Sequence, residues 1–258
     1  MSGEFGPPDG DIILRTQGVS PRDFKLHKLV LSLASPVFRD IFSLPQPVSD
    51  VPRADIEIID VTDPPEALDL VLRFIYPQFT LPNIDKLNLL VESLVIAEKY
   101  DIGRARTELR SRLSKFAKEN PLRVYAIAFR FGFEEEAEEA FSLTTGIYLP
   151  ALVDLPDDLK YIPATAYHKL VRFHEKRREE IEDAVNGVPF EAGCPECKWA
   201  KALAESTLRT KLVRTICRSE PIKAAGCIEQ LGICCRGTCL RKFVDSVVAK
   251  LGSNNAVV

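Results

Sequence analysis

The alternation of apolar and polar residues near the start of the chain predicts a small β-sheet. Asp11 to Leu14 is a short apolar run with β-branched residues, and after a turn-rich stretch residues 24–27 alternate apolar and polar, as a half-buried strand does. Residues 56–59 form another β-branched run, preceded by a loop with three prolines. We therefore expect a hairpin in the first 28 residues and a third strand at 56–59.

Apolar residues at helical spacing predict helices through most of the remaining chain. Ser35 and Pro36 are a suitable N-cap and first residue for a short helix. By the same reasoning, Asp63 is the expected cap of a second helix and Thr165 that of a long one. Further apolar stripes predict a helix over 84–99, one from Ile102 to Phe116, one that ends at Gly132, and another around Ala137 to Phe141.

The residues from Asp11 to Phe42 resemble the opening of a BTB/POZ domain. The family pattern places an acid before the first strand, a His-basic pair after the second, and a Ser-x-x-Phe motif at the start of a helix. The matching residues are Asp11, Phe24, His27, Lys28, Leu31, Ser35, Phe38 and Phe42. Later segments, Phe74 to Tyr76 and Ala97 to Tyr100, are similar to two further family motifs. The resemblance covers about residues 9–116.

This resemblance implies an α+β fold, in which a small three-stranded sheet with a cluster of helices is followed by an all-α extension. We expect a flexible tail over 1–8, the BTB/POZ domain over 9–116 and a helical, BACK-like extension over 117–190. A cysteine-containing helical region over 191–251 and a tail over 252–258 complete the chain. Residues 167–174 also resemble a segment of fungal BTB proteins.

The resemblance implies a protein–protein interaction adaptor or scaffold rather than an enzyme. Its expected partners are a second copy or a cullin-type ubiquitin-ligase scaffold at the BTB domain, and a client protein at the helical extension. The expected partner-binding residues are Asp11, Lys28, Phe38, Phe42, Val48 and Asp50. Val48 and Asp50 stand in a loop where cullin adaptors of the family carry an apolar residue, any residue and a Glu.

Two alternatives are open for Asp11 and Lys28. In dimeric family members the matching acid and base meet in a charged groove between protomers, where partner peptides bind. In a monomer the pair would form an internal ion pair. Only ten Gly- and Pro-rich residues precede Asp11, which disfavours a swapped, intertwined dimer.

Composition indicates a globular protein in a reducing compartment. Of 258 residues, 46% are hydrophobic and 28% charged, and no apolar run reaches the length of about 18 residues that spans a bilayer. The first residues show no secretory signal, so we expect a cytoplasmic or nuclear protein without membrane contact. No nucleotide-binding or nucleophile motif is present, and we expect no catalytic residues.

The seven cysteines leave three interpretations open. Cys194 and Cys197 are spaced C-x2-C and Cys235 and Cys239 C-x3-C, so the four together could hold one structural zinc ion. Alternatively, the cysteines are reduced and buried as small hydrophobes, and the protein has no cofactor. A redox role for the C-x-x-C pair is disfavoured because no strand precedes Cys194.

Charge is distributed unevenly along the chain, whose net charge is −3. From Cys194 onward there are 11 Lys and Arg against 5 Asp and Glu, which leaves −9 for the residues before it. A nuclear regulator that binds nucleic acid is therefore the alternative function. Its phosphate-contacting candidates are Lys198, Lys201, Arg209, Lys211, Arg214 and Arg218. An acidic and a basic face that pack on each other or are solvated explain the asymmetry more simply, so nucleic-acid binding is the less favoured interpretation.

Overall fold

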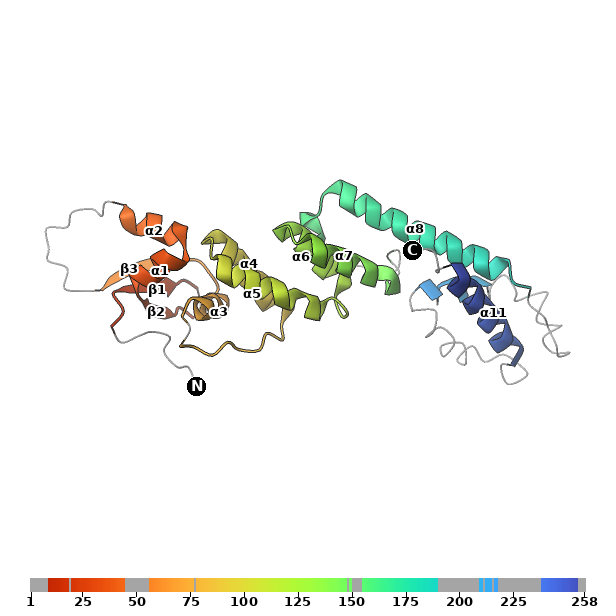
Figure 1. The fold of residues 1–258 in the computed structure, drawn as a ribbon, viewed down its shortest axis with the longest axis horizontal. Helices are drawn as coiled ribbons and strands as arrows, with labels where there is room; N and C mark the ends of the chain where they lie inside the picture. The colour runs from red at the N-terminus through yellow and green to blue at the C-terminus, as the bar shows by residue number, and fades with distance from the viewer. Residues whose placement is uncertain are drawn as a thin grey trace. The chain divides into compact units, whose positions relative to one another are not determined.

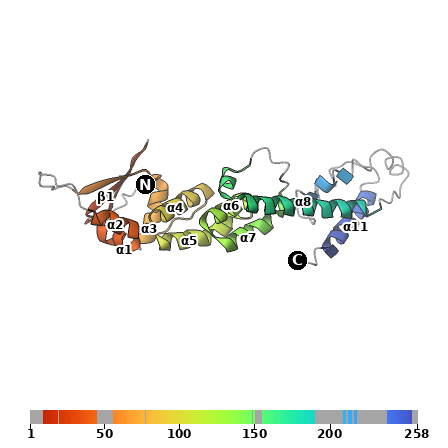
Figure 2. The ribbon, with the colours of Figure 1, turned by 90° about the horizontal axis from the view of Figure 1, so that it is seen from above.

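The computed structural model contains two compact units, Met1–Phe116 and Ala117–Val258. It describes residues 9–18, 20–44, 56–76, 78–147, 149, 155–189, 209–210, 212–214, 216–217 and 238–254. Figures 1 and 2 show the chain as a ribbon coloured from red at the N-terminus to blue at the C-terminus.

The first unit contains a three-stranded mixed sheet. Strand β1 (Ile12–Thr16) lies in the centre, antiparallel to β2 (Asp23–Leu26) and parallel to β3 (Glu57–Val61), so that the strand order is β2-β1-β3. Ile12 pairs with Leu26 on one side and with Glu57 on the other. The predicted α+β fold with a small three-stranded sheet is therefore confirmed.

Helices make up most of the rest of the first unit. They are α1 (Lys28–Ala34), α2 (Pro36–Ser43), α3 (Pro65–Ile75), α4 (Leu87–Lys99), α5 (Gly103–Leu113) and the short 3-10 helix η1 (Ser114–Phe116). Figure 1 shows α1 and α2 beside the sheet, and α4 and α5 lie next to each other in both views.

The core of the first unit lies between the sheet and these helices. Alternate residues of β1 and β2 are fully buried, as their period of two requires. Helix α3 is buried on most of its circumference, because its neighbours cover more than one of its faces. The largest fully buried side chains of this core are Phe24, Phe38, Phe74, Ile12, Leu14, Leu26, Leu31, Leu68, Leu70, Leu72 and Leu90.

The predicted caps of the first unit had different outcomes. Ser35 accepts a hydrogen bond from the backbone N–H of Phe38 at 3.0 Å, so the predicted N-cap of α2 is confirmed. The prediction that Asp63 caps α3 is wrong, because Pro64 holds that position and no side chain caps the helix. The Asp63 carboxylate is engaged instead by Lys99 and Tyr100.

Every secondary-structure element among the described residues of the second unit is a helix. Its elements are α6 (Pro121–Phe131), α7 (Glu134–Leu143), the 3-10 helices η2 (Thr144–Gly146) and η4 (Asp157–Tyr161), α8 (Ala164–Asn186) and α11 (Thr238–Asn254). Helices α6 and α7 form an antiparallel pair. The prediction that Thr165 caps α8 is wrong, since Pro163 is the N-cap and Thr165 lies in the first turn.

Gly132 makes the tight connection between α6 and α7. Its φ of 69° lies in the left-handed region, and its N–H bonds the carbonyl of Phe129, which ends α6 as the sequence predicts. The next residue, Phe133, starts α7, whose first turn carries Glu134, Glu135 and Glu136. Acidic side chains are favourable there because the helix N-terminus carries partial positive charge.

A separate apolar cluster joins α8 and α11 to residues 212–213 and 216–217. Ile181, Ala184 and Val185 supply the α8 side, and Phe243, Val244, Val247 and Leu251 supply the α11 side. Leu212, Ile216 and the buried thiol of Cys217 lie between them. In the part of the chain that the structure describes, no helix is long and apolar enough to cross a membrane.

Candidate functional site: the partner-binding surfaces

Asp11 binds the start of α1 through the backbone of Lys28. The backbone N–H of Lys28 donates to Oδ1 of Asp11 at 2.8 Å. His27, the N-cap of α1, makes no side-chain capping bond, so a carboxylate from the segment before β1 supplies the missing acceptor. This placement also puts a negative charge at the helix N-terminus, where it is favourable.

The ammonium of Lys28 pairs with a different carboxylate, that of Glu57. Nζ of Lys28 lies 2.5 Å from Oε2 of Glu57, at the start of β3, and 5.9 Å from the ring centroid of Phe42. The expectation of an internal Asp11–Lys28 ion pair is therefore wrong. The physical reason is that Glu57 pairs with Ile12 in the parallel part of the sheet. This pairing brings the side chain of Glu57, which is longer than that of Asp11, to the start of α1.

Phe38 is a core residue and Phe42 is half-buried. The Phe38 side chain is 1% exposed, and its ring stacks on Tyr100 at a centroid distance of 4.5 Å and on Phe42 at 5.9 Å. Ser35 donates to the carbonyl of Tyr100 and accepts the Phe38 N–H, which ties the α1–α2 junction to the end of α4. Phe38 therefore supports the surface near Phe42 from below and does not itself offer area to a partner.

Helix α1 leaves two large apolar side chains in solvent. Leu29 is 70% exposed and Leu33 is 79% exposed, whereas Leu31 between them is fully buried. The two exposed leucines are four residues apart, so they lie on the same face of the helix. A groove of about 300 Å³ adjoins Leu33, and its remaining lining residues are Val30, Ala34, Phe74, Ile75, Ile102 and Arg104. Leu29, Leu33 and this groove are called the α1 surface below.

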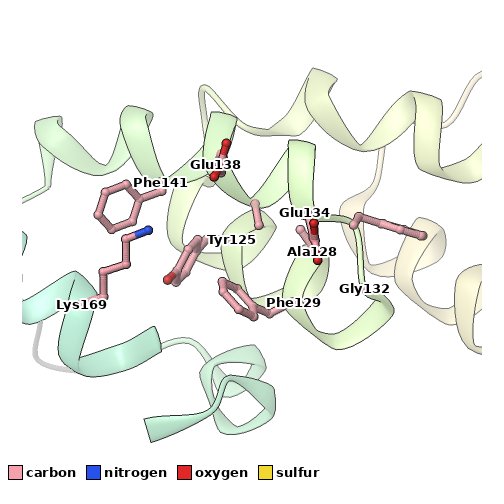
Figure 3. Close-up of a pocket in the computed structure, with 10 residues that line it drawn as sticks. Tyr125, Ala128, Phe129, Gly132, Glu134, Glu138, Phe141 and Lys169 are labelled. Atoms are coloured by element: carbon pink, nitrogen blue, oxygen red, sulfur yellow. The ribbon is translucent and has the colours of Figure 1, made fainter. Parts of the chain in front are cut away.

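A second apolar groove lies in the helical extension, between α6, α7 and α8. Its volume is about 530 Å³, within the range of sites that hold ligands or anchoring side chains. Figure 3 shows Tyr125 and Phe129 side by side, Glu134 and Glu138 on α7, and Lys169 reaching from α8 toward Phe141. This groove is called the α6–α7 groove below.

The comparison with known families decides the nature of the first unit. Residues 10–117 match the family model of the BTB/POZ domain. Residues 10–117 form a BTB/POZ domain. No curated protein matches the chain. The BTB/POZ resemblance drawn from Asp11 to Phe42 is thus confirmed, and BTB/POZ domains are typically protein–protein interaction modules.

Several residues expected to bind partners or metal lie outside the described residues. They are Val48 and Asp50 of the loop after α2, together with Cys194, Cys197 and Cys235. Cys239 belongs to α11, but its side chain is not described. Within the described ranges there is no group of three or more His, Cys, Asp and Glu that could hold a metal ion. The zinc site and the loop contact therefore stay predictions.

The α1 surface of the BTB domain was missed by sequence reasoning, although a signal was present. The sequence shows Leu29, Val30, Leu31 and Leu33 as one apolar run, which suggests that all of them are buried. In the seven-residue helix α1 these four side chains point in different directions around the helix axis, so packing of one face cannot bury them all. The helical spacing of Leu29 and Leu33 on the side opposite Leu31 was the usable signal.

Two ionisable side chains have strongly shifted pKa values because they are buried. Burial raises the pKa of the Tyr100 hydroxyl, and its hydrogen bond to the Asp63 carboxylate raises it further. Burial also lowers the pKa of His174 to about 4, helped by the nearby Arg177. Nε2 of His174 contacts the hydroxyl of Thr144 at 3.2 Å. Both side chains stabilise the fold in their neutral forms.

One of the candidate phosphate-binding residues has a structural role. The guanidinium of Arg209 donates to the carbonyls of Val185 and, at 3.1 Å, of Val188, and it lies 5.1 Å from the ring centroid of Phe243. Arg209 therefore links the C-terminal end of α8 to α11. Arg214 is exposed, and the side chains of Lys198, Lys201, Lys211 and Arg218 lie outside the described residues.

Proposed function

We propose that this protein is an interaction adaptor, in which the BTB domain binds one protein through the α1 surface and the helical extension binds a client. The observation that carries this proposal is the exposure of Leu29 and Leu33, at 70% and 79%, on one face of a short helix. Burying a leucine side chain is worth roughly 1.5–3 kcal/mol, so this face gains free energy when a partner covers it.

The partner proposed for the α1 surface is a second copy of the chain. Two copies related by a two-fold axis would place Leu29 and Leu33 of one α1 against the same leucines of the other, with no need for a second complementary patch. The groove beside Leu33 would accept side chains from the opposing helix. Lys28 is engaged by Glu57, so the nearest lysine does not bring an unpaired charge to the interface.

Sedimentation equilibrium of the full chain tests this interface. The wild-type protein is expected to dimerise, and the double variant Leu29→Glu, Leu33→Glu is expected to be monomeric, because four carboxylates would be buried together. Leu81→Glu is the matched control, since Leu81 is 38% exposed and lies outside the α1 surface. A wild-type monomer, or equal dimerisation of the double variant, would overturn the proposal.

A cullin-type ubiquitin-ligase scaffold is the more specific version of the BTB partner. It is supported by the sequence Val48-Ser49-Asp50, in which an apolar residue precedes an acid by two positions. Calorimetric titration with a cullin N-terminal helical domain tests it. Binding that is lost in Val48→Asp would establish ligase recruitment, and an absence of binding would leave the adaptor without it.

Nucleic-acid binding through the basic C-terminal region is the alternative function. Arg209, one of its six candidates, is engaged by two backbone carbonyls, so the structure offers it little support. Affinity for duplex DNA measured at several salt concentrations tests it, because phosphate contacts produce a steep salt dependence. Binding that is absent at low salt would remove this alternative.

A further inference from the structure

The α6–α7 groove has an apolar floor built from aromatic rings. Tyr125 stands edge-on to Phe129 at a centroid distance of 4.9 Å and is tilted against Phe141 at 5.7 Å. Ala128 and Ala137 are small, so they leave the space between the rings open. The groove of about 530 Å³ can thus accept one or two large apolar side chains.

Phe129 is the ring in this groove that remains most available to a partner. It is 38% exposed, although the neighbouring Tyr125 is 2% exposed in the same helix. Burial of the free part of a phenyl ring is favourable, and aromatic pairs with offset or edge geometry add to that gain. A side chain that covers Phe129 would therefore serve as the anchor of a bound segment.

Two carboxylates at the edge of the groove lack an ion-pair partner among the described residues. Glu134 and Glu138 are exposed, line the groove and lie one helical turn apart on α7. Two like charges at this spacing repel each other mildly, so a cation placed between them is favoured. The edge formed by α7 is therefore complementary to a Lys or Arg side chain.

Lys169 decides where such a cation can bind. Its Nζ lies 5.2 Å from the ring centroid of Phe141, so the aromatic face at that end is already covered by an ammonium group. A second cation at the Phe141 end would be repelled. Positive charge from a partner is therefore directed to Glu134 and Glu138, next to the open ring of Phe129.

We propose that the α6–α7 groove binds a short segment of a client protein in which a large apolar residue is adjacent to a Lys or Arg. The apolar side chain packs on Phe129 and Tyr125, and the basic side chain pairs with Glu134 and Glu138. This inference rests on the adaptor function proposed above and specifies the chemistry of its client. Acidic segments are disfavoured beside Phe129, because Glu134 and Glu138 would repel a further carboxylate there.

Selection of a random peptide-display library on the full chain tests the proposal. Selected peptides are expected to share an apolar residue next to a Lys or Arg. The affinity of one such peptide, measured by fluorescence polarisation, is expected to fall about 10-fold or more in Glu138→Lys, which corresponds to loss of about 1.4 kcal/mol. Glu139→Lys is the matched control, because Glu139 is exposed on the same helix but does not line the groove.

A charge swap separates recognition from a loss of folding. A peptide whose basic residue is replaced by Glu is expected to bind Glu138→Lys better than wild type. Adding Phe129→Ser should weaken the binding of the basic peptide to the otherwise wild-type chain and of the acidic peptide to Glu138→Lys, because both peptides use the same apolar anchor. Equal affinity of wild type, Glu138→Lys and Glu139→Lys for the basic peptide would overturn the proposal. Selected peptides that lack a basic residue would also overturn it, as would dimerisation of the chain that depends on Glu138.

The two proposals can fail independently. The variant Leu29→Glu, Leu33→Glu is expected to retain full peptide affinity, because both leucines belong to the BTB domain and none lines the α6–α7 groove. Peptide binding by a chain that does not dimerise would overturn the α1 interface alone. A chain that dimerises but binds no peptide through the α6–α7 groove would overturn the groove proposal alone.

Discussion

The hydroxyl of Tyr100 donates a hydrogen bond of 2.5 Å to Oδ2 of Asp63, a carboxylate whose side chain is 8% exposed. Lys99 contacts both oxygens of the same carboxylate at 2.9 Å. The ring of Tyr100 also stacks on Phe38, and its carbonyl accepts from Ser35. One residue at the end of α4 therefore joins the start of α3 to the α1–α2 junction of the BTB domain.

Tyr100→Phe is expected to lower the free energy of unfolding by about 1.5–3 kcal/mol, the usual contribution of a hydrogen bond to a charged group. The ring stacking on Phe38 stays, so the loss isolates the hydroxyl. Urea titration of the full chain measures it. Tyr161→Phe, at a tyrosine that is 41% exposed, is expected to change stability by less than about 0.5 kcal/mol. Equal losses in both variants would contradict this role for the Tyr100 hydroxyl.

Asp11→Ala is expected to destabilise the BTB domain by about 1 kcal/mol, because the Lys28 N–H at the start of α1 loses its acceptor. Asp11→Asn should retain most of the stability, since an amide oxygen can accept the same hydrogen bond. Thermal unfolding of the three proteins tests this. If Asn is as damaging as Ala, the charge of Asp11 matters more than its capping bond.

His174 makes the stability of the helical extension depend on pH. Its pKa in the folded protein is about 4, below the ordinary value of 6.5, so the unfolded chain binds the proton first as pH falls. Its contribution is complete above about pH 6.5 and is lost as pH falls toward 4, by up to about 3 kcal/mol.

Unfolding of the wild type, His174→Gln and His168→Gln at pH 7, above this window, and at pH 5, inside it, tests that dependence. His168 lies exposed on the same helix and serves as the control. The difference in stability between the two pH values should shrink in His174→Gln and stay unchanged in His168→Gln. The same pH dependence in all three proteins would show that His174 does not cause it.

Gly132→Ala is expected to destabilise the extension by about 1–2 kcal/mol. Its φ of 69° is unfavourable for a residue with a Cβ, even though no atom lies within 4 Å of the added methyl group. Gly103→Ala is the control, because Gly103 also has open space but lacks a positive φ. Thermal unfolding should therefore show a loss for Gly132→Ala and little change for Gly103→Ala. An equal loss in both would show that the positive φ of Gly132 is not the cause.

Local features of the sequence were predicted well where neighbouring residues alone decide them. Ser35 and Pro36 begin α2 because a hydroxyl and a fixed φ act within one turn of the chain. Gly132 ends α6 for an equally local reason. Asp63 failed as a cap, since the side chains of Lys99 and Tyr100, far along the chain, compete for its carboxylate.

The candidate site was predicted only in part. The motif that contains Asp11, Lys28 and Phe38 led to the BTB fold, but burial of Phe38 and pairing of Lys28 with Glu57 depend on packing between distant segments. The exposure of Leu29 depends on which face of α1 meets the core.

By itself, the sequence determined the family of the first unit, the helical nature of the extension and the positions of most elements. These follow from short-range periodicity and from motif residues close together in the chain. Only the tertiary structure decided which side chains share a surface. The α6–α7 groove brings Tyr125, Glu138 and Lys169 together from three helices, and no local pattern specifies such a meeting. Burial and ion pairing are properties of the packed chain, because they depend on which neighbours exclude water.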